Sequence, residues 1–357
     1  MYQADNDTAI RIKEFMERIR TDYKLFIGFP GSTDFDYREL YPFFGYLLNN
    51  VGDPYQVPLH ANHSKAMEQE VVEFFADLFR APKKDRWGYV NNGGTEGNLY
   101  ALYVARELYP KARVYYSQTA HYSLPKNVHI LGMPSTVIKV RPNDEIDYDD
   151  LQHELDAHKS EPAIVVANIG TTMAEARDDV AKIKRILNDT GIGQHFVHSD
   201  AALAGTYTAL LRPHHPFDFK DGADSVSISG HKFIGSPMAC GVVIVRKSHM
   251  DTIRRSASYV GSPDTTISGS RNGHTPLLLW YAIQRWGLEG FRKRAEASLA
   301  LAEYTHSELQ RIGWQTWRNP SAITVMLASP PRKLIYKWQL ATHDGTHFAL
   351  SSSHSLS

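Results

Sequence analysis

Apolar residues recur at helical spacing near the start of the chain. Ile12, Phe15, Met16 and Ile19 lie three or four residues apart, which predicts an amphipathic helix over residues 8–20. A second stripe of the same kind predicts another helix, with Met67, Val71, Phe74, Phe75 and Leu78 on one face. The stretch 28–62 between them is rich in Pro, Gly, Asp and Tyr. We expect it to be an ordered but irregular segment.

From about residue 87 to residue 246, short apolar runs alternate with helical patterns such as Val180–Asn188. The expected strands are Trp87–Val90, Ala112–Tyr116, Thr136–Val140, Ala163–Ile169, Gln194–Ser199, Asp224–Ile228 and Gly241–Arg246. This alternation predicts an α/β fold with a large, mostly parallel sheet that is covered on both faces. Ligands of such sheets bind at the carboxyl ends of the strands.

The pattern changes after residue 246. A loop rich in Ser, Thr and Gly runs from Ser256 to Gly273, and two long helices are expected near 276–287 and 289–312. One strand, Ala322–Leu327, and a polar tail follow, and we expect residues 350–357 to be disordered. The predicted division is an N-terminal helix and irregular segment over 1–60, a large cofactor-binding domain over 61–255, and a small C-terminal domain over 256–357.

Composition narrows the class of protein. With 357 residues and 42% hydrophobic residues, the chain is long enough to bury a large and a smaller core. Its 39 basic and 39 acidic residues balance, which argues against a nucleic-acid or anionic-membrane partner. We expect no membrane span, because no long apolar run occurs, and the polar N-terminus is unlike a secretion signal. The single cysteine, Cys240, fits a reducing compartment, so we expect a cytoplasmic protein.

Two residues carry the most specific chemical signal. Lys232 lies in the turn Ser229-Gly230-His231-Lys232-Phe233 between two apolar strands, and Asp200 closes an earlier strand. Pyridoxal 5′-phosphate (PLP) requires a lysine amine that bonds to its aldehyde and an aspartate that keeps its pyridine nitrogen protonated. Either residue alone is more simply read as a solvated lysine or a turn residue. Together with the glycine-rich turn described next, they predict this cofactor.

That turn, Asn91-Asn92-Gly93-Gly94-Thr95-Glu96-Gly97-Asn98, links a strand to a helix. Gly94 lets the backbone approach an anion closely, Thr95 adds a hydroxyl, and the helix start supplies free N–H groups, so the turn suits a phosphate. It is not a nucleotide P-loop, because the Gly-Lys-Ser/Thr ending is absent. Ser229 and His231 are also placed to donate to the phosphate.

Other candidate residues depend on this interpretation. His121 follows a strand and is placed to stack on the pyridine ring, and Thr171 closes another strand near the cofactor or the substrate carboxylate. The run 265–273, with Ser268 and Gly269, is either an anion-binding loop or an interdomain linker. Tyr259, just before it, is a candidate mobile proton donor.

Other catalytic classes fit the sequence poorly. It has no His-Glu-x-x-His helix, no paired cysteine ligands and no Gly-x-Ser-x-Gly elbow. A His60/His63 pair lacks further ligands, so we expect no metal.

The order of these motifs resembles the group II PLP-dependent amino-acid decarboxylases, with bacterial histidine decarboxylases and plant serine decarboxylases as the nearest branches. The resemblance runs from about residue 25 to about residue 345. It rests on Asn49-Asn50-Val51-Gly52-Asp53, Trp87-Gly88-Tyr89-Val90, Gly93-Gly94-Thr95-Glu96-Gly97-Asn98, Ala120-His121-Tyr122-Ser123, Asn168-Ile169-Gly170-Thr171-Thr172, Asp200-Ala201-Ala202, Ser229-Gly230-His231-Lys232-Phe233 and Gly269-Ser270-Arg271-Asn272-Gly273-His274.

The resemblance implies PLP fold-type I and a homodimer with shared active sites. It implies Lys232 bonded to the cofactor, Asp200 on the pyridine nitrogen and His121 stacked on the ring. Gly94, Thr95, Ser229 and His231 would hold the phosphate, and the loop with Ser268 and Gly269 would reach it from the neighbouring subunit. Tyr259 matches a tyrosine on a mobile catalytic loop.

The implied reaction is decarboxylation of an L-amino acid, with histidine the first choice of substrate, serine the second and a branched aliphatic amino acid the third. A lyase or aminotransferase on the same fold is one alternative. The chain departs from the family pattern at Ala322, where the pattern has serine, and in its serine-rich C-terminus. A catalytically impaired relative is therefore the other alternative.

Overall fold

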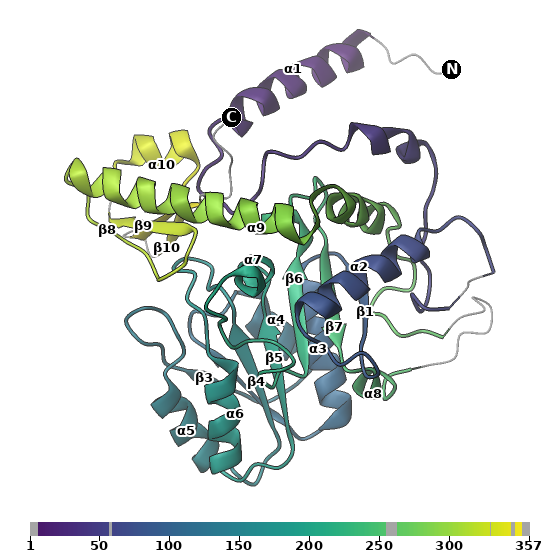
Figure 1. Ribbon diagram of the computed structural model, residues 1–357, viewed down its shortest axis with the longest axis vertical. Coiled ribbons are helices and arrows are strands. Elements are labelled where there is room, and N and C mark those ends of the chain that lie inside the picture. Colours follow the sequence, from purple (N-terminus) through teal and green to yellow (C-terminus); the bar gives the residue numbers. More distant parts are fainter. Residues whose placement is uncertain (1–5, 57–58, 255–262, 329, 344–346, 352–357) are drawn as a thin grey trace.

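The structure, a computed structural model, describes residues 6–56, 59–254, 263–328, 330–343 and 347–351 (Figure 1). Seven strands form the large sheet in the order β1-β7-β6-β5-β4-β2-β3. Their bounds are β1 Trp87–Asn91, β2 Arg113–Ser117, β3 Ser135–Ile138, β4 Ala163–Asn168, β5 His195–Asp200, β6 Ser225–Ser229 and β7 Gly241–Val245. Only β7 runs antiparallel to its neighbours, β1 and β6. The predicted α/β fold with a mostly parallel sheet is confirmed.

Helices cover both faces of this sheet (Figure 1). They are α2 Lys65–Leu78, α3 Gly94–Leu108, α4 Ser123–Ile130, α5 Tyr148–Ala157, α6 Val180–Asp189, α7 Gly205–Leu210 and α8 Lys247–Met250. Successive side chains of a strand point to opposite faces. Val165 of β4 accordingly packs in one hydrophobic core with α2, α5, α6 and α7, whereas Val166 packs in the other with α3, α4 and α8. Burial on both sides explains the continuous apolar runs in the sequence.

The C-terminal part begins with α9, His274–Arg311. Gly287 interrupts its helical geometry with φ 57° and ψ −175°, which confirms two consecutive helices that meet at this glycine. The strands β8 Thr316–Trp317, β9 Thr324–Ala328, β10 Ala341–His343 and β11 His347–Ser351 form an antiparallel sheet in the order β10-β11-β9-β8, and α10 spans Arg332–Trp338.

The prediction of one strand and a disordered end was therefore wrong in part. Leu350 and Ser351 pair with Val325 and Thr324 of β9. Antiparallel pairing uses the backbone, so the serine-rich sequence does not prevent it. Residues 352–357 lie outside the described residues. The domain boundaries at residues 60 and 255 stay predictions.

A buried carboxylate connects the two sheets. Glu175, in the loop after β4, accepts hydrogen bonds from Ile323 N at 3.1 Å and Thr324 Oγ1 at 2.7 Å. Thr324 is the first residue of β9, and Ile323 directly precedes it. It also pairs with the buried guanidinium of Arg177 at 3.1 Å. Ala322 is fully buried next to these contacts, and its backbone carbonyl accepts from Arg318 Nη1 at 2.7 Å.

The N-terminal segment lies outside both sheets. Helix α1, Asn6–Tyr23, confirms the amphipathic helix of the sequence and extends away from the body of the molecule (Figure 1). None of its residues is buried, and Ile12 and Phe15 are 59% and 56% exposed. The following stretch is irregular, as expected, apart from the 3₁₀ helix η1, Arg38–Gly45. Within the described ranges, the helices are too short or too polar to span a bilayer.

Candidate active site

A cavity of about 220 Å³ lies at the carboxyl ends of the parallel strands, against the start of α3. Several chain segments that are far apart in the sequence line it. The residues predicted for the site that line this cavity are Gly94, Thr95, His121, Thr171, Asp200, Ser229, His231 and Lys232. The ends of parallel strands meet at one edge of the sheet, and this brings the separate motifs together.

Asp200 is the last residue of β5 and is 6% exposed. Its Oδ2 accepts a hydrogen bond from Asn98 Nδ2 at 2.6 Å, and its Oδ1 accepts one from Ala202 N at 3.2 Å. With one donor on each oxygen, the carboxylate is held in a defined plane at the floor of the cavity. A fixed acceptor of this kind suits a ligand with a protonated ring nitrogen.

Lys232 lies in η2, Gly230–Ile234, which follows β6. Its backbone departs from helical geometry, with φ −89° and ψ −112°. Its carbonyl accepts from Ser32 Oγ at 2.9 Å, so the irregular N-terminal segment anchors the backbone beneath the amine. Burial lowers the pKa of the Lys232 ammonium, and the charge of Asp200 opposes this shift only in part. At a given pH, a larger fraction of Lys232 is therefore in the neutral, nucleophilic form than of a solvated lysine.

The turn before α3 forms one wall of the cavity. Gly93 has φ +126°, a conformation that side chains rarely adopt. A Cβ on Gly94 would lie 2.8 Å from Ala202 Cβ and 3.2 Å from Ser229 Oγ. The first N–H groups of α3 have no partner within the helix. The turn therefore presents backbone donors and a helix N-terminus to the cavity, as an anionic group requires.

Both histidines of the cavity are held by local contacts. His121 Nδ1 accepts from Ser123 N at 3.3 Å and lies 2.7 Å from Ser123 Oγ, which leaves Nε2 to carry the proton of the neutral ring. His231 Nδ1 lies 3.0 Å from Cys240 O. Burial lowers the pKa of both imidazoles, so they are uncharged at neutral pH.

Thr171 contributes to the cavity wall in a way the sequence did not indicate. Its Oγ1 accepts from Ala176 N at 3.0 Å, and its own N–H donates to Ala176 O at 3.0 Å. The hydroxyl therefore orders the loop after β4, where Thr171 lines the cavity.

Two of the predicted residues that the structure describes are not brought into this cavity. Ser268 and Gly269 lie in a loop that packs on the segment 49–53, where Gly269 O accepts from Gly52 N at 3.4 Å. Their assignment to the site of a neighbouring subunit stays a prediction. Tyr259 lies outside the described residues.

Asn98 and Tyr122 also line the cavity, although neither was predicted from the sequence as a site residue. Asn98 lies one helical turn after Gly94, so it faces the same side of α3, and this spacing is the signal that identifies it.

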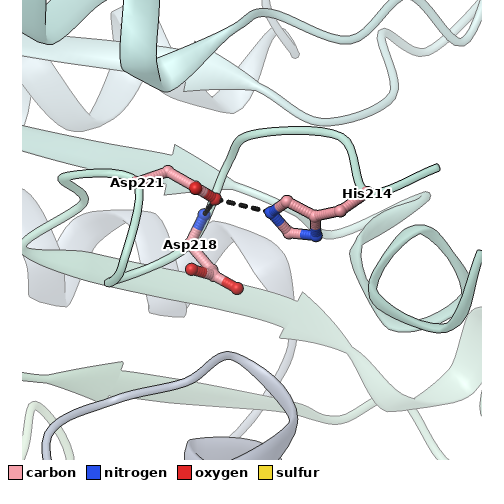
Figure 2. A group of neighbouring side chains, drawn as sticks. All are labelled: His214, Asp218 and Asp221. Carbon is pink, nitrogen blue, oxygen red and sulfur yellow. Dashed lines mark hydrogen bonds and ion pairs between the residues drawn. The ribbon is translucent and has the colours of Figure 1, made fainter. Parts of the chain in front are cut away.

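In the part of the chain that the structure describes, a further cluster of possible metal-ligand atoms lies away from this cavity. Figure 2 shows His214, Asp218 and Asp221, with His214 Nε2 2.8 Å from Asp221 Oδ2. The Arg80 guanidinium lies between the carboxylates and donates to Asp218 Oδ2 and Asp221 Oδ2, each at 2.6 Å. The Arg80 guanidinium already contacts both carboxylates, so we interpret the cluster as an ion network that joins the end of α2 to the segment before β6.

The residues of the cavity fit PLP. An amine and a fixed carboxylate line the same cavity, and so does the turn at the start of α3, in which Gly94 has no room for a Cβ. The backbone N–H groups of this turn are positioned to receive a phosphate. His121 adds a neutral imidazole ring to these groups. These groups match the aldehyde, the pyridine nitrogen, the phosphate and the aromatic face of the cofactor.

Comparisons with known proteins agree with this fit. Residues 60–314 match the family profile described as "Pyridoxal-dependent decarboxylase conserved domain". The chain is 48% identical to a histidine decarboxylase of Mesorhizobium japonicum, over 96% of this chain and 92% of that protein. It is 42% identical to a histidine decarboxylase of Morganella morganii, over 92% of this chain and 88% of that protein.

Among solved structures, an L-methionine decarboxylase from Streptomyces sp. 590 superimposes with a TM-score of 0.89 at 25% identity, covering 98% of this chain and 92% of that chain. The fold is therefore PLP fold-type I, and the cofactor is PLP. The chain belongs to the family of pyridoxal-dependent decarboxylases.

Proposed function

We propose that this enzyme decarboxylates L-histidine to histamine and carbon dioxide. The observation that carries the choice of substrate is the 48% and 42% identity, over nearly the whole chain, to relatives described as histidine decarboxylases. The alternatives are L-serine, which would give ethanolamine, and a branched aliphatic amino acid. Each gives a different amine, so product analysis separates them.

PLP, when bound, accepts the electron pair left behind when the carboxylate departs. The residue roles proposed here supply what that chemistry needs from the protein. Lys232 Nζ, whose neutral form is favoured by burial, would be the amine that holds the cofactor through its aldehyde. Asp200, with one donor on each oxygen, holds the proton on the pyridine nitrogen. Without that proton the ring is a weaker electron acceptor.

The remaining roles concern binding and proton return. Gly94, Thr95, Ser229 and His231 bind the phosphate, and Thr171 orders the wall beside it. His121 stacks on the ring, with its Nε2 proton directed by the contact of Nδ1 to Ser123. Tyr259 or His121 returns a proton to the substrate Cα. The orientation of the scissile bond selects decarboxylation over transamination, and about 1.4 kcal/mol between those barriers is tenfold in outcome.

We also propose a homodimer with shared active sites, in the cytoplasm. Helix α1 presents Ile12, Phe15, Met16 and Ile19 to solvent, each at least 41% exposed. Around η1, Tyr41, Tyr46 and Leu47 are 60%, 70% and 76% exposed. Apolar surface on this scale is typical of an interface with a second copy. In the dimer, the loop with Ser268 and Gly269 would complete the partner's phosphate site. The buried Cys240 suits a reducing compartment.

The test is to incubate the purified protein and PLP separately with each common L-amino acid and to analyse amines and carbon dioxide. We expect histamine from L-histidine, and no amine from a Lys232→Ala control. Ethanolamine or an aliphatic amine as the main product would overturn the substrate. A keto acid as the main product, or a cofactor absorbance band without any amine, would overturn the activity.

A further inference from the structure

A chain of hydrogen-bonding side chains continues behind Asp200, away from the cavity. Asn98 Nδ2 donates to Asp200 Oδ2 at 2.6 Å. On its other side, Asn98 Oδ1 lies 2.9 Å from His198 Nε2 and accepts from Ser227 Oγ at 2.7 Å. His198 Nδ1 lies 2.8 Å from Ser225 Oγ. Elements β5, β6 and α3 each contribute to this chain, and their packing brings the four residues behind Asp200 together.

The contacts allow one direction of donation. The Asp200 carboxylate only accepts, so the amide nitrogen of Asn98 must face it and the amide oxygen must face His198. That oxygen also only accepts, so His198 Nε2 carries the proton. The Nδ1 atom of a neutral His198 then accepts from Ser225 Oγ. Each donor points toward the next residue, and the chain ends on Asp200. Hydrogen bonds in such a row polarise one another.

The side chains in this row of hydrogen bonds are buried, and His198 is uncharged. Asn98 is 1% exposed and His198 is fully buried. Desolvation lowers the pKa of His198 to about 4, although the charge of Asp200 acts in the opposite direction. A protonated His198 would be a cation near Asp200. It would compete with the pyridine nitrogen of the cofactor for the negative charge of that carboxylate. The neutral ring leaves that charge to face the cavity.

We propose that Asn98 and His198 are positioning residues that orient the Asp200 carboxylate toward the pyridine nitrogen of the cofactor. Asn98 does so directly, and His198 does so by fixing the Asn98 amide against rotation. Strand alternation places His198 and Asp200 on the same face of β5, so both side chains meet α3 at Asn98. The proposal rests on the role given to Asp200, and it does not depend on which amino acid is the substrate.

The test measures the bound cofactor without substrate. The visible absorbance of the PLP-loaded protein is titrated with pH for the parent, Asn98→Ala, Asp200→Ala and the double variant. We expect Asn98→Ala to shift the apparent pKa of the cofactor by about one unit, a tenfold change in proton affinity, in the same direction as Asp200→Ala. In the Asp200→Ala background, Asn98→Ala should cause no further shift, because coupled residues do not act additively.

Two substitutions at position 198 separate positioning from core filling. His198→Phe should shift the cofactor in the same direction as Asn98→Ala but by less, since Ser227 still holds Asn98 Oδ1. His198→Gln keeps an amide donor near the position of Nε2, so its titration should lie closer to the parent than that of His198→Phe. With L-histidine, Asn98→Ala should lower kcat about tenfold with KM unchanged, as expected for a change that acts on the electron acceptor and not on substrate binding.

Asn319→Ala is the matched control. Asn319 is also buried and donates to backbone carbonyls, to Ala174 O at 2.8 Å and Asn143 O at 3.0 Å, but its amide makes no contact with Asp200. It should lose thermal stability and leave the cofactor titration unchanged. The proposal is overturned if Asn98→Ala leaves the titration at the parent value. It is equally overturned if its shift adds in full to that of Asp200→Ala, or if Asn319→Ala shifts the cofactor as much.

Discussion

The buried imidazole of His198 makes the stability of the protein depend on pH in a defined window. Its pKa is lowered from the ordinary value of 6.5 to about 4 in the folded state, chiefly by desolvation. Between these two values the unfolded chain binds a proton that the folded chain does not. The free energy of unfolding therefore falls as the pH is lowered through this window.

The size of the effect follows from the shift. Over the full titration of His198, the free energy of unfolding changes by about 3 kcal/mol, since one pKa unit is about 1.4 kcal/mol. Between about pH 7 and about pH 5, the linkage relation gives a loss of about 2 kcal/mol from this residue alone. Replacing His198 by Gln removes the titrating group while keeping an amide near the same position. The variant should be less stable than the parent at neutral pH and should lose less stability on acidification.

Urea denaturation of the apoprotein at fixed protein concentration, repeated across this pH range, measures the difference. The apoprotein avoids a contribution from cofactor binding, and the fixed concentration is needed because a dimer's stability depends on it. An exposed histidine, His153, provides the control, and His153→Gln should keep the parent's pH dependence. Identical pH slopes for the parent and His198→Gln would refute the reasoning, because carboxylates alone would then account for the acid sensitivity.

Three further predictions concern the cofactor turn, the contact between the sheets and the exposed helix. Gly94→Ala should weaken PLP binding to the apoprotein at least about tenfold, because the added Cβ would collide with Ala202. Fluorescence quenching measures the affinity, and a value like that of the parent would contradict the close packing. Glu175→Ala should cost about 3–5 kcal/mol in urea denaturation, since it leaves the buried Arg177 unpaired, and a loss below about 1 kcal/mol would contradict that role. Phe15→Glu should give monomers in sedimentation experiments, and an unchanged dimer would show that α1 does not form the interface.

Site residues and helix breaks that are marked by the local pattern of apolar and polar residues could be predicted from the sequence. Asp200 was identifiable because it ends a recognisable strand, and Lys232 because it lies in the turn directly after another. Strand ends of this kind meet at one edge of a mostly parallel sheet. The helix break at Gly287 was also predictable, because two helical patterns meet there. These features depend on residues that are close together in the chain.

Features that depend on long-range packing could not be predicted. Ser32 anchors the backbone of Lys232 from a distant irregular segment, and no periodic pattern marks such a contact. The row of hydrogen bonds behind Asp200 joins Asn98 of α3 to His198 of β5, and it forms only when the helix is packed on the sheet. The strand ending at Ser351 was missed because its pairing uses the backbone and leaves little trace in the side chains.

The covalent attachment of the cofactor is the most direct test of the whole account. The PLP-loaded protein is reduced with borohydride, digested and mapped by mass spectrometry. The account predicts a single pyridoxyl label, on the peptide that contains Lys232, and no such label after Lys232→Ala. A label on another lysine, with the Lys232 peptide unmodified, would contradict it.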